Sequence, residues 1–90
     1  MSKIITKRCK HGIFSFSQND MFIGRSLDLY GEYCENEFLI MEMLIQPNFI
    51  ILDVGANLGL HTVWFSKHAF TGKVNSFEPN EFNRQLLHHN

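Results

Sequence analysis

Residues 49–64 read Phe-Ile-Ile-Leu-Asp-Val-Gly-Ala-Asn-Leu-Gly-Leu-His-Thr-Val-Trp, an apolar run followed by a loop with two glycines and then by a helical pattern. The run from Phe49 to Val54 is largely β-branched and aromatic, which is typical of a strand buried on both faces of a parallel sheet. Leu60, Val63 and Trp64 then recur at helical spacing. This stretch therefore predicts a strand, a tight loop and a helix.

A second strand and a second helix follow directly. Thr71-Gly72 is a turn, Lys73-Val-Asn-Ser-Phe-Glu78 has the composition of a strand, and Pro79-Asn80 begins a helix that runs to the end of the sequence. Strand, helix and strand in this order, within about 30 residues, form a βαβ unit whose two strands are parallel. The sequence accordingly predicts an α/β fold.

Two elements are expected before this unit. Apolar residues alternate with serine over Ile13–Ser17, and Asn19-Asp20 is typical of a turn, so we expect a β-hairpin of two short strands within residues 11–29. An apolar stretch over residues 36–45 follows Asn36, a residue that can cap a helix. Because this predicted helix is apolar on most of its circumference, we expect it to be largely covered.

Candidate binding residues lie at the predicted carboxyl ends of both strands, where ligands bind in such folds. The first strand ends with Asp53, and Gly55 and Gly59 then flank Asn57. Glycines let the backbone turn sharply and approach a ligand, and the helix that follows offers unpaired N–H groups to a carboxylate such as a methionine tail. The second strand ends with Glu78, whose carboxylate can accept hydrogen bonds from both hydroxyls of a ribose.

The loop also indicates which nucleotide fits. Dinucleotide-binding folds carry Gly-x-Gly-x-x-Gly, which places a pyrophosphate on the helix N-terminus. The loop here is Gly-x-Asn-x-Gly, so Asn57 stands where the middle glycine is missing. No Gly-Lys-Ser/Thr follows, which excludes a P-loop. The pattern favours a nucleoside ligand without a pyrophosphate, and an NAD(P)-linked oxidoreductase stays as the alternative enzyme class.

Two segments, Ile51–Thr62 and Gly72–Asn80, together closely resemble the FkbM-type methyltransferase family, and Tyr30–Glu37 resembles the family's lead-in. The resemblance spans roughly residues 28–90. It implies a class I, Rossmann-like fold that uses S-adenosylmethionine, often for O-methylation of a small molecule, a sugar or a lipid. The resemblance implies the following cofactor-binding residues: Asp53, Gly55, Asn57, Gly59, His61, Thr62, Glu78 and Asn80.

The sequence stops at Asn90, within the second predicted helix, so we expect the Rossmann-like fold to be truncated after its first βαβ unit. Residues 1–46 are expected to hold the hairpin and the lead-in helix, and residues 47–90 the start of an incomplete S-adenosylmethionine-binding domain. We expect the acceptor pocket to be absent from these residues, and no residue is nominated as the catalytic base. A non-catalytic remnant is therefore a further alternative.

Composition excludes several other classes of protein. The net charge of −1 indicates neither nucleic acid nor an anionic membrane as a partner, and no apolar run approaches the ~18–20 residues of a membrane span. We expect no signal peptide, because Ile4-Ile5 is immediately followed by polar residues. Cys9 and Cys34 are expected to form neither a disulfide framework nor a metal-binding pair, because neither has a partner at ligand spacing. Adjacent histidines such as His88-His89 chelate a metal poorly. We expect a cytoplasmic protein with free thiols and no metal centre.

Overall fold

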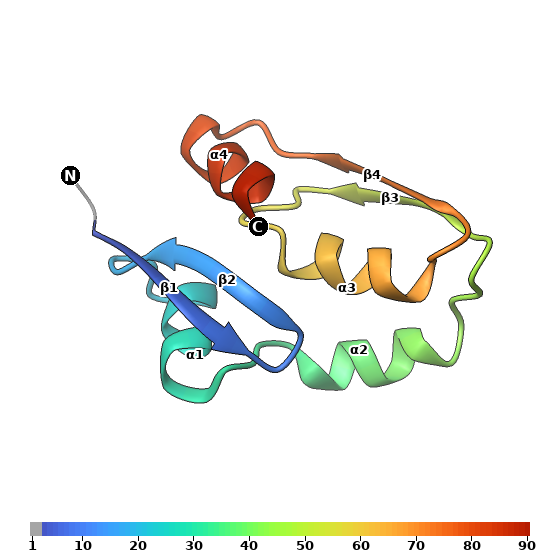
Figure 1. Cartoon of the computed structure of the whole chain (residues 1–90), viewed down its shortest axis with the longest axis horizontal. Helices are drawn as coiled ribbons and strands as arrows, with labels where there is room; N and C mark the ends of the chain where they lie inside the picture. The colour runs from blue at the N-terminus through green and yellow to red at the C-terminus, as the bar shows by residue number, and fades with distance from the viewer. Residues whose placement is uncertain (1–2) are drawn as a thin grey trace.

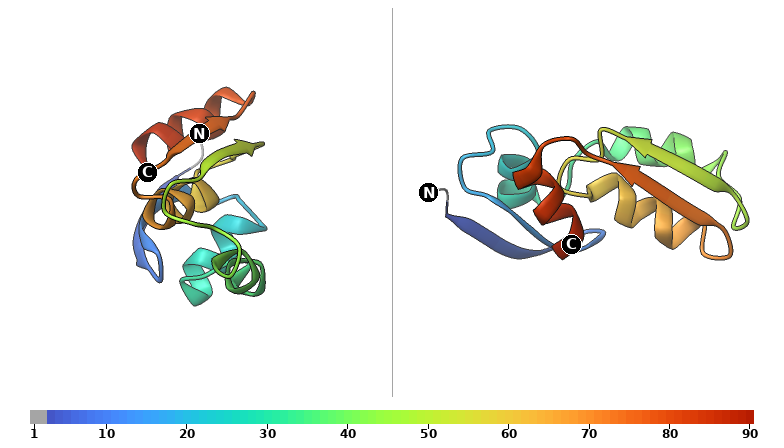
Figure 2. Two further views of the ribbon diagram at one scale, coloured as in Figure 1. Left: turned by 90° about the vertical axis from the view of Figure 1, so that its right-hand side faces the viewer. Right: turned by 90° about the horizontal axis from the view of Figure 1, so that it is seen from above.

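The computed structural model describes residues 3–90, which form two small sheets and four helices (Figure 1). The elements in chain order are β1 (Ile4–Cys9), β2 (Gly12–Ser17), α1 (Ile23–Tyr30), α2 (Glu35–Glu42), β3 (Ile50–Val54), α3 (Leu60–His68), β4 (Lys73–Phe77) and α4 (Glu81–His89). The Cα atoms span 40 × 26 × 17 Å. The hairpin and α1 lie at one end of the long axis and the β3–β4 sheet at the other (Figures 1 and 2).

The predicted βαβ unit is confirmed. β3 and β4 pair in parallel, with Asp53 opposite Ser76 and Val54 opposite Phe77, and α3 connects them. α3 lies against one face of this sheet, and α2 lies beyond α3 (Figure 1). The α/β class predicted from the sequence is therefore correct, and the carboxyl ends of both strands meet at one edge.

The prediction that β3 is buried on both faces is wrong. Burial alternates along the strand, and Ile50, Leu52 and Val54 are 74%, 64% and 78% exposed. Ile51, which points the other way, packs against the core. Within residues 3–90, α3 covers one face of the sheet, while α4 packs against β2 rather than on the opposite face. A strand of this composition thus presents an uncovered apolar face.

The hairpin exists, and its predicted strand over Ile13–Ser17 is confirmed as β2, but the predicted turn and second strand are wrong. β2 pairs antiparallel with β1, which precedes it, and the chain reverses at residues 10–11 instead of Asn19-Asp20. The segment after that turn is helix α1. The Asp20 carboxylate accepts the N–H of Phe22 at 3.0 Å and the Asp20 carbonyl accepts that of Arg25 at 2.9 Å, which supports a helical start. Leu27 of α1 is fully buried, so packing against the hairpin favours the helix.

Helix α2 occupies most of the predicted residues 36–45, but its cap and its cover differ. Its N-cap is Cys34 in the left-handed conformation (φ 58°), so Asn36 lies inside the first turn and does not cap. Phe38 is buried and stacks on Trp64 of α3 at a ring-centroid distance of 4.9 Å. Leu39, however, is 59% exposed, and the apolar side chains of Ile40, Met43 and Leu44 are exposed as well. The prediction of a largely covered helix is wrong, because α3 covers one side of α2.

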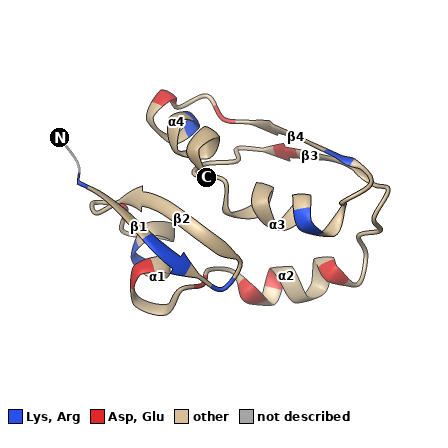
Figure 3. Cartoon of the chain, in the orientation of Figure 1, with Lys and Arg blue, Asp and Glu red and all other residues tan. Residues whose placement is uncertain are grey.

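The Glu35 carboxylate links the hairpin to α2. Figure 3 shows basic residues of the hairpin close to the acidic start of α2. Glu35 pairs with Lys10 at 2.9 Å and with His11 Nε2 at 2.6 Å. Burial acts to raise the pKa of Glu35, but the hydrogen bonds and charges of Lys10 and His11 outweigh it and lower the pKa below its ordinary value. This pairing adds a polar link to the aromatic contact between His11 and Phe38.

One hydrophobic core joins residues from both sides of the predicted boundary at 46/47. Its buried members are Phe14, Phe16, Leu27, Phe38, Leu58, Leu60, Trp64, Phe65 and Leu86. The side chain of Asn90 adds polar links, since its amide donates to the carbonyls of Ser15 and Leu58 at 2.9 and 2.8 Å. Among residues 3–90, no helix has the length and apolar character needed to cross a membrane.

Candidate functional site

The carboxyl ends of β3 and β4 are joined by backbone hydrogen bonds that bring the candidate residues together. The N–H groups of Gly55 and Ala56 donate to the carbonyl of Phe77 at 2.8 and 3.0 Å. The loop after β3 therefore folds over the end of β4, because two consecutive donors share one acceptor there. This geometry places the loop directly beside Glu78, the first residue after β4.

Both carboxylate oxygens of Glu78 accept backbone N–H groups. Oε1 accepts from Asn57 at 2.7 Å, and Oε2 accepts from Asn80 at 2.9 Å. The carboxylate thus connects the loop after β3 to the start of α4. Each oxygen has a further lone pair, so these bonds leave acceptor capacity for ligand hydroxyls. The structure brings together Asn57, Glu78 and Asn80 around this carboxylate.

A second polar group links the two strands through α3. The Thr62 hydroxyl donates to Asp53 Oδ2 at 2.6 Å and lies 2.7 Å from the Ser76 hydroxyl. Since the single hydroxyl proton of Thr62 goes to the carboxylate, Ser76 donates to Thr62. Ser76 was not predicted as a site residue, although it lies opposite Asp53 in the parallel register of the two strands. These bonds hold the Asp53 carboxylate in a fixed orientation.

The two loop glycines have different surroundings. Gly55 has φ +75°, and a Cβ built there would have no atom within 4 Å, so its flank is open to a ligand. Gly59 has φ +102°, and a Cβ there would lie 2.8 Å from Leu87 Cδ1. Gly59 therefore permits α4 to pack closely on the start of α3. Asn57, with φ 56°, also adopts the left-handed conformation.

Two candidate residues have other contacts. The His61 ring lies 4.9 Å from that of Phe38, and its Nε2 lies 4.0 Å from Glu37 Oε1, so it faces α2 rather than the loop. The Asn80 side chain caps α4 by accepting the N–H of Asn83 at 3.0 Å. Asn80 meets Glu78 through its backbone, and His61 lies apart from the residues around Glu78.

A hollow of about 360 Å³ opens beside the loop, between the segment after β2 and α4. Its walls are formed by Ser17, Asn19, Asp20, Asn57, Phe82, Asn83 and Leu86. They combine hydroxyl, amide and carboxylate groups with one aromatic ring, a mixture that suits a polar ligand with a flat apolar part. Asn57 thus lies at the junction between this hollow and the Glu78 carboxylate.

No protein family model, curated protein or solved structure matches this chain. What the site can do follows from its own chemistry. Two carboxylates, Asp53 and Glu78, lie at the end of a parallel strand pair, beside the open flank of Gly55. Such a site can accept hydrogen bonds from hydroxyl and ammonium groups and favours a ligand that carries positive charge.

Proposed function

We propose that this chain binds S-adenosylmethionine at the carboxyl ends of β3 and β4. It would be the cofactor-binding part of a cytoplasmic, class I Rossmann-like methyltransferase of the FkbM type, which transfers the methyl group to a hydroxyl of a small molecule, sugar or lipid. The observation that carries the proposal is the Glu78 carboxylate, which lies across the strand ends and contacts the Gly-x-Asn-x-Gly loop at Asn57. A carboxylate in this place can accept both ribose hydroxyls of the adenosine.

Charge favours this ligand over a dinucleotide. S-adenosylmethionine carries a sulfonium and an ammonium group, whereas NAD carries a pyrophosphate. Thr62 orients Asp53 through one carboxylate oxygen, so the other oxygen can accept from the ammonium group of the methionine tail. Two carboxylates at one strand edge attract the cationic ligand and repel the anionic one.

Packing at the start of α3 points the same way. A dinucleotide fold needs free N–H groups at this helix start to hold the pyrophosphate. Here Leu87 packs so closely on Gly59 that α4 covers the position. We therefore expect the amino end of α3 to exclude a pyrophosphate.

The test is isothermal titration of the full chain with S-adenosylmethionine, S-adenosylhomocysteine, NAD⁺ and NADP⁺. We expect both sulfur nucleosides to bind at least about tenfold more tightly than either dinucleotide, a difference of about 1.4 kcal/mol. Binding of NAD⁺ without binding of S-adenosylhomocysteine would overturn the proposal in favour of an oxidoreductase. A thermal melt followed by circular dichroism is the control. A cooperative transition without any nucleoside binding would contradict the proposal. A melt without a cooperative transition would favour the non-catalytic remnant.

A further inference from the structure

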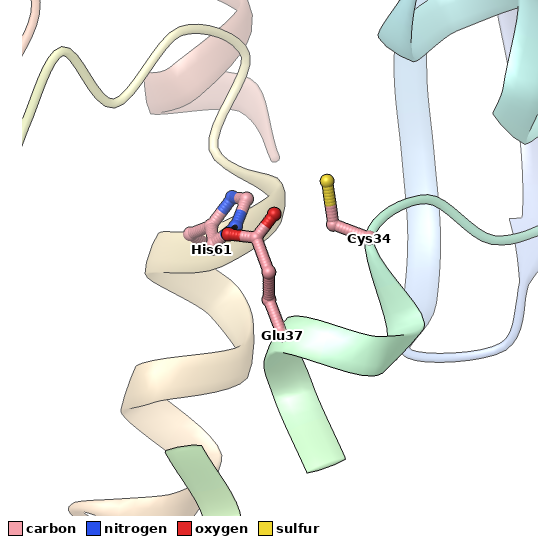
Figure 4. Close-up of side chains that lie close together, drawn as sticks. All are labelled: Cys34, Glu37 and His61. Carbon is pink, nitrogen blue, oxygen red and sulfur yellow. Dashed lines mark ion pairs between the residues drawn. The ribbon is translucent and has the colours of Figure 1, made fainter. Parts of the chain in front are cut away.

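Three side chains that commonly bind metals meet between α2 and α3, outside the residues around Glu78. They are Cys34, which precedes α2, Glu37 in the first turn of α2, and His61 in the first turn of α3. The sulfur, one carboxylate oxygen and one ring nitrogen all lie within 4.8 Å of one another. Figure 4 shows Glu37 and His61 directed toward each other from the two helices, with Cys34 beside them.

The local fold explains why these groups meet. Cys34 takes the left-handed conformation, and its carbonyl accepts the N–H groups of Glu37 and Phe38 at 3.0 and 3.2 Å, which starts the helix. Cys34 is the N-cap residue and Glu37 lies in the first turn of α2, so both side chains are at the amino end of this helix. The His61 ring is held by Phe38 at 4.9 Å and by Phe65 at 6.2 Å. These ring contacts thus hold the imidazole between the two helices.

We propose that Cys34, Glu37 and His61 bind a Zn²⁺ ion that ties α2 to α3. A thiol, an imidazole and a carboxylate are the donors that zinc takes in proteins, whereas Mg²⁺ and Ca²⁺ prefer oxygen ligands alone. With zinc–ligand bonds of about 2.0–2.3 Å, tetrahedral coordination puts ligand atoms about 3.2–3.7 Å apart. Since the three ligand atoms lie within 4.8 Å of one another, each separation needs to close by at most about 1.1–1.6 Å.

The Glu37 side chain has room to take part in this closure. Its side chain is 62% exposed, while that of His61 is 26% exposed, so the carboxylate can move toward an ion beside the more enclosed ring. Three protein ligands leave the fourth position of zinc to water. Binding of the ion to the folded chain stabilises it, because the three ligands are 27 residues apart at their extremes and meet after folding.

The experiment titrates the full, reduced chain with Co²⁺, whose thiolate complexes absorb in the near ultraviolet. We expect one equivalent to bind with a thiolate-to-cobalt band and the visible bands of tetrahedral cobalt, and Zn²⁺ to displace it. Cys34→Ser abolishes the thiolate band. Glu37→Gln and His61→Ala weaken Zn²⁺ binding at least about 100-fold, the upper end of what loss of a supporting residue costs a metal site.

Matched variants control for the other thiol and for surface histidines. Cys9→Ser keeps the thiolate band, and His88→Ala/His89→Ala leaves the tight equivalent unchanged. Zn²⁺ raises the melting temperature of the wild type but not of Cys34→Ser. A wild type without the band, a band that survives Cys34→Ser, or unchanged affinity in the exposed-site variant Glu37→Gln would each overturn the proposal. None of these measurements depends on nucleoside binding, so a negative result for the zinc site would leave the proposed function unaffected, and the reverse also holds.

Discussion

Glu78 Oε1 accepts the backbone N–H of Asn57 at 2.7 Å, so the first residue after β4 holds the loop that follows β3. The other oxygen of the same carboxylate accepts the N–H of Asn80. One side chain therefore organises both strand ends and is also the proposed ribose acceptor. Substitutions at this position are expected to affect the loop and the ligand together, and the experiments below are designed to separate the two effects.

Glu78→Gln should weaken S-adenosylhomocysteine binding by about 1–3 kcal/mol, because hydrogen bonds to a charged acceptor are lost. The amide preserves the size of the side chain but replaces one acceptor oxygen by a donor, which faces an N–H group of the loop or of α4. Isothermal titration measures the affinity, and circular dichroism reports the fold. Glu81→Gln, an exposed change in the first turn of α4, is the matched control and should leave the affinity unchanged. Equal affinities for Glu78→Gln and the wild type would remove Glu78 from the site.

Alanine substitutions at the two loop glycines should have unequal costs. Gly55→Ala should lower the free energy of unfolding by about 1–2 kcal/mol, the cost of a left-handed conformation with a Cβ. Gly59→Ala adds to the same backbone strain a Cβ that would lie 2.8 Å from Leu87 Cδ1, the end of a flexible side chain, so overpacking should add about 1 kcal/mol, the lower end of its usual range. Urea denaturation measures both. Leu87→Ala should reduce the additional cost in a double mutant with Gly59→Ala but not with Gly55→Ala, and equal costs at the two glycines would contradict this packing.

Thr62→Val should destabilise the protein by about 1–2 kcal/mol. The substitution keeps the shape of the side chain but removes the hydroxyl that Asp53 and Ser76 share, so both partners lose a hydrogen bond. The midpoint of urea denaturation measures the loss. Thr71→Val is the control, because Thr71 is exposed in the turn before β4. A variant at position 62 that is as stable as this control would show that the strand-to-helix link contributes nothing.

The lowered pKa of Glu35 predicts an acid-labile contribution to stability. A carboxyl group whose pKa is lower in the folded state stabilises the fold fully above its unfolded pKa and loses that contribution as pH falls through the folded pKa. The difference in unfolding free energy between the wild type and Glu35→Gln should therefore shrink as the pH falls below the ordinary value of 4.5. Urea denaturation at a series of pH values measures it.

Two controls accompany this experiment. Glu42→Gln, an exposed change at the other end of α2, should not reproduce the pH dependence. Lys10→Met removes one of the two partners of Glu35 and should reduce the acid-labile difference. A difference between wild type and Glu35→Gln that is the same from neutral to acidic pH would contradict the proposed pairing.

Much of the βαβ unit could be predicted because its signals are local. The apolar run into Asp53, the glycines of the loop, and the turn at Thr71-Gly72 each define an element from neighbouring residues alone. The parallel pairing follows from the connecting helix, and it brings Glu78 to the loop at Asn57. Ser76 was missed because its role depends on which residues lie opposite each other in the sheet.

The N-terminal region shows where local signals fail. Asn19-Asp20 resembles a hairpin turn, yet β2 pairs with the strand before it, and α1 fills the space where a second strand was expected. The choice depends on the burial of Leu27 against the hairpin, a long-range contact that composition does not reveal. The cover of an apolar element is equally non-local, as the exposed face of β3 demonstrates.

The sequence by itself determined the order of strand, loop, helix and strand and the residue types at the strand ends, because periodicity and turn chemistry act over a few residues. The tertiary structure decided which surfaces are covered, that His61 faces α2, and that Cys34 and Glu37 meet it there. Those relations arise from packing between segments far apart in the chain. The energy of that packing depends on the shapes of both partners, and neither segment contains it alone.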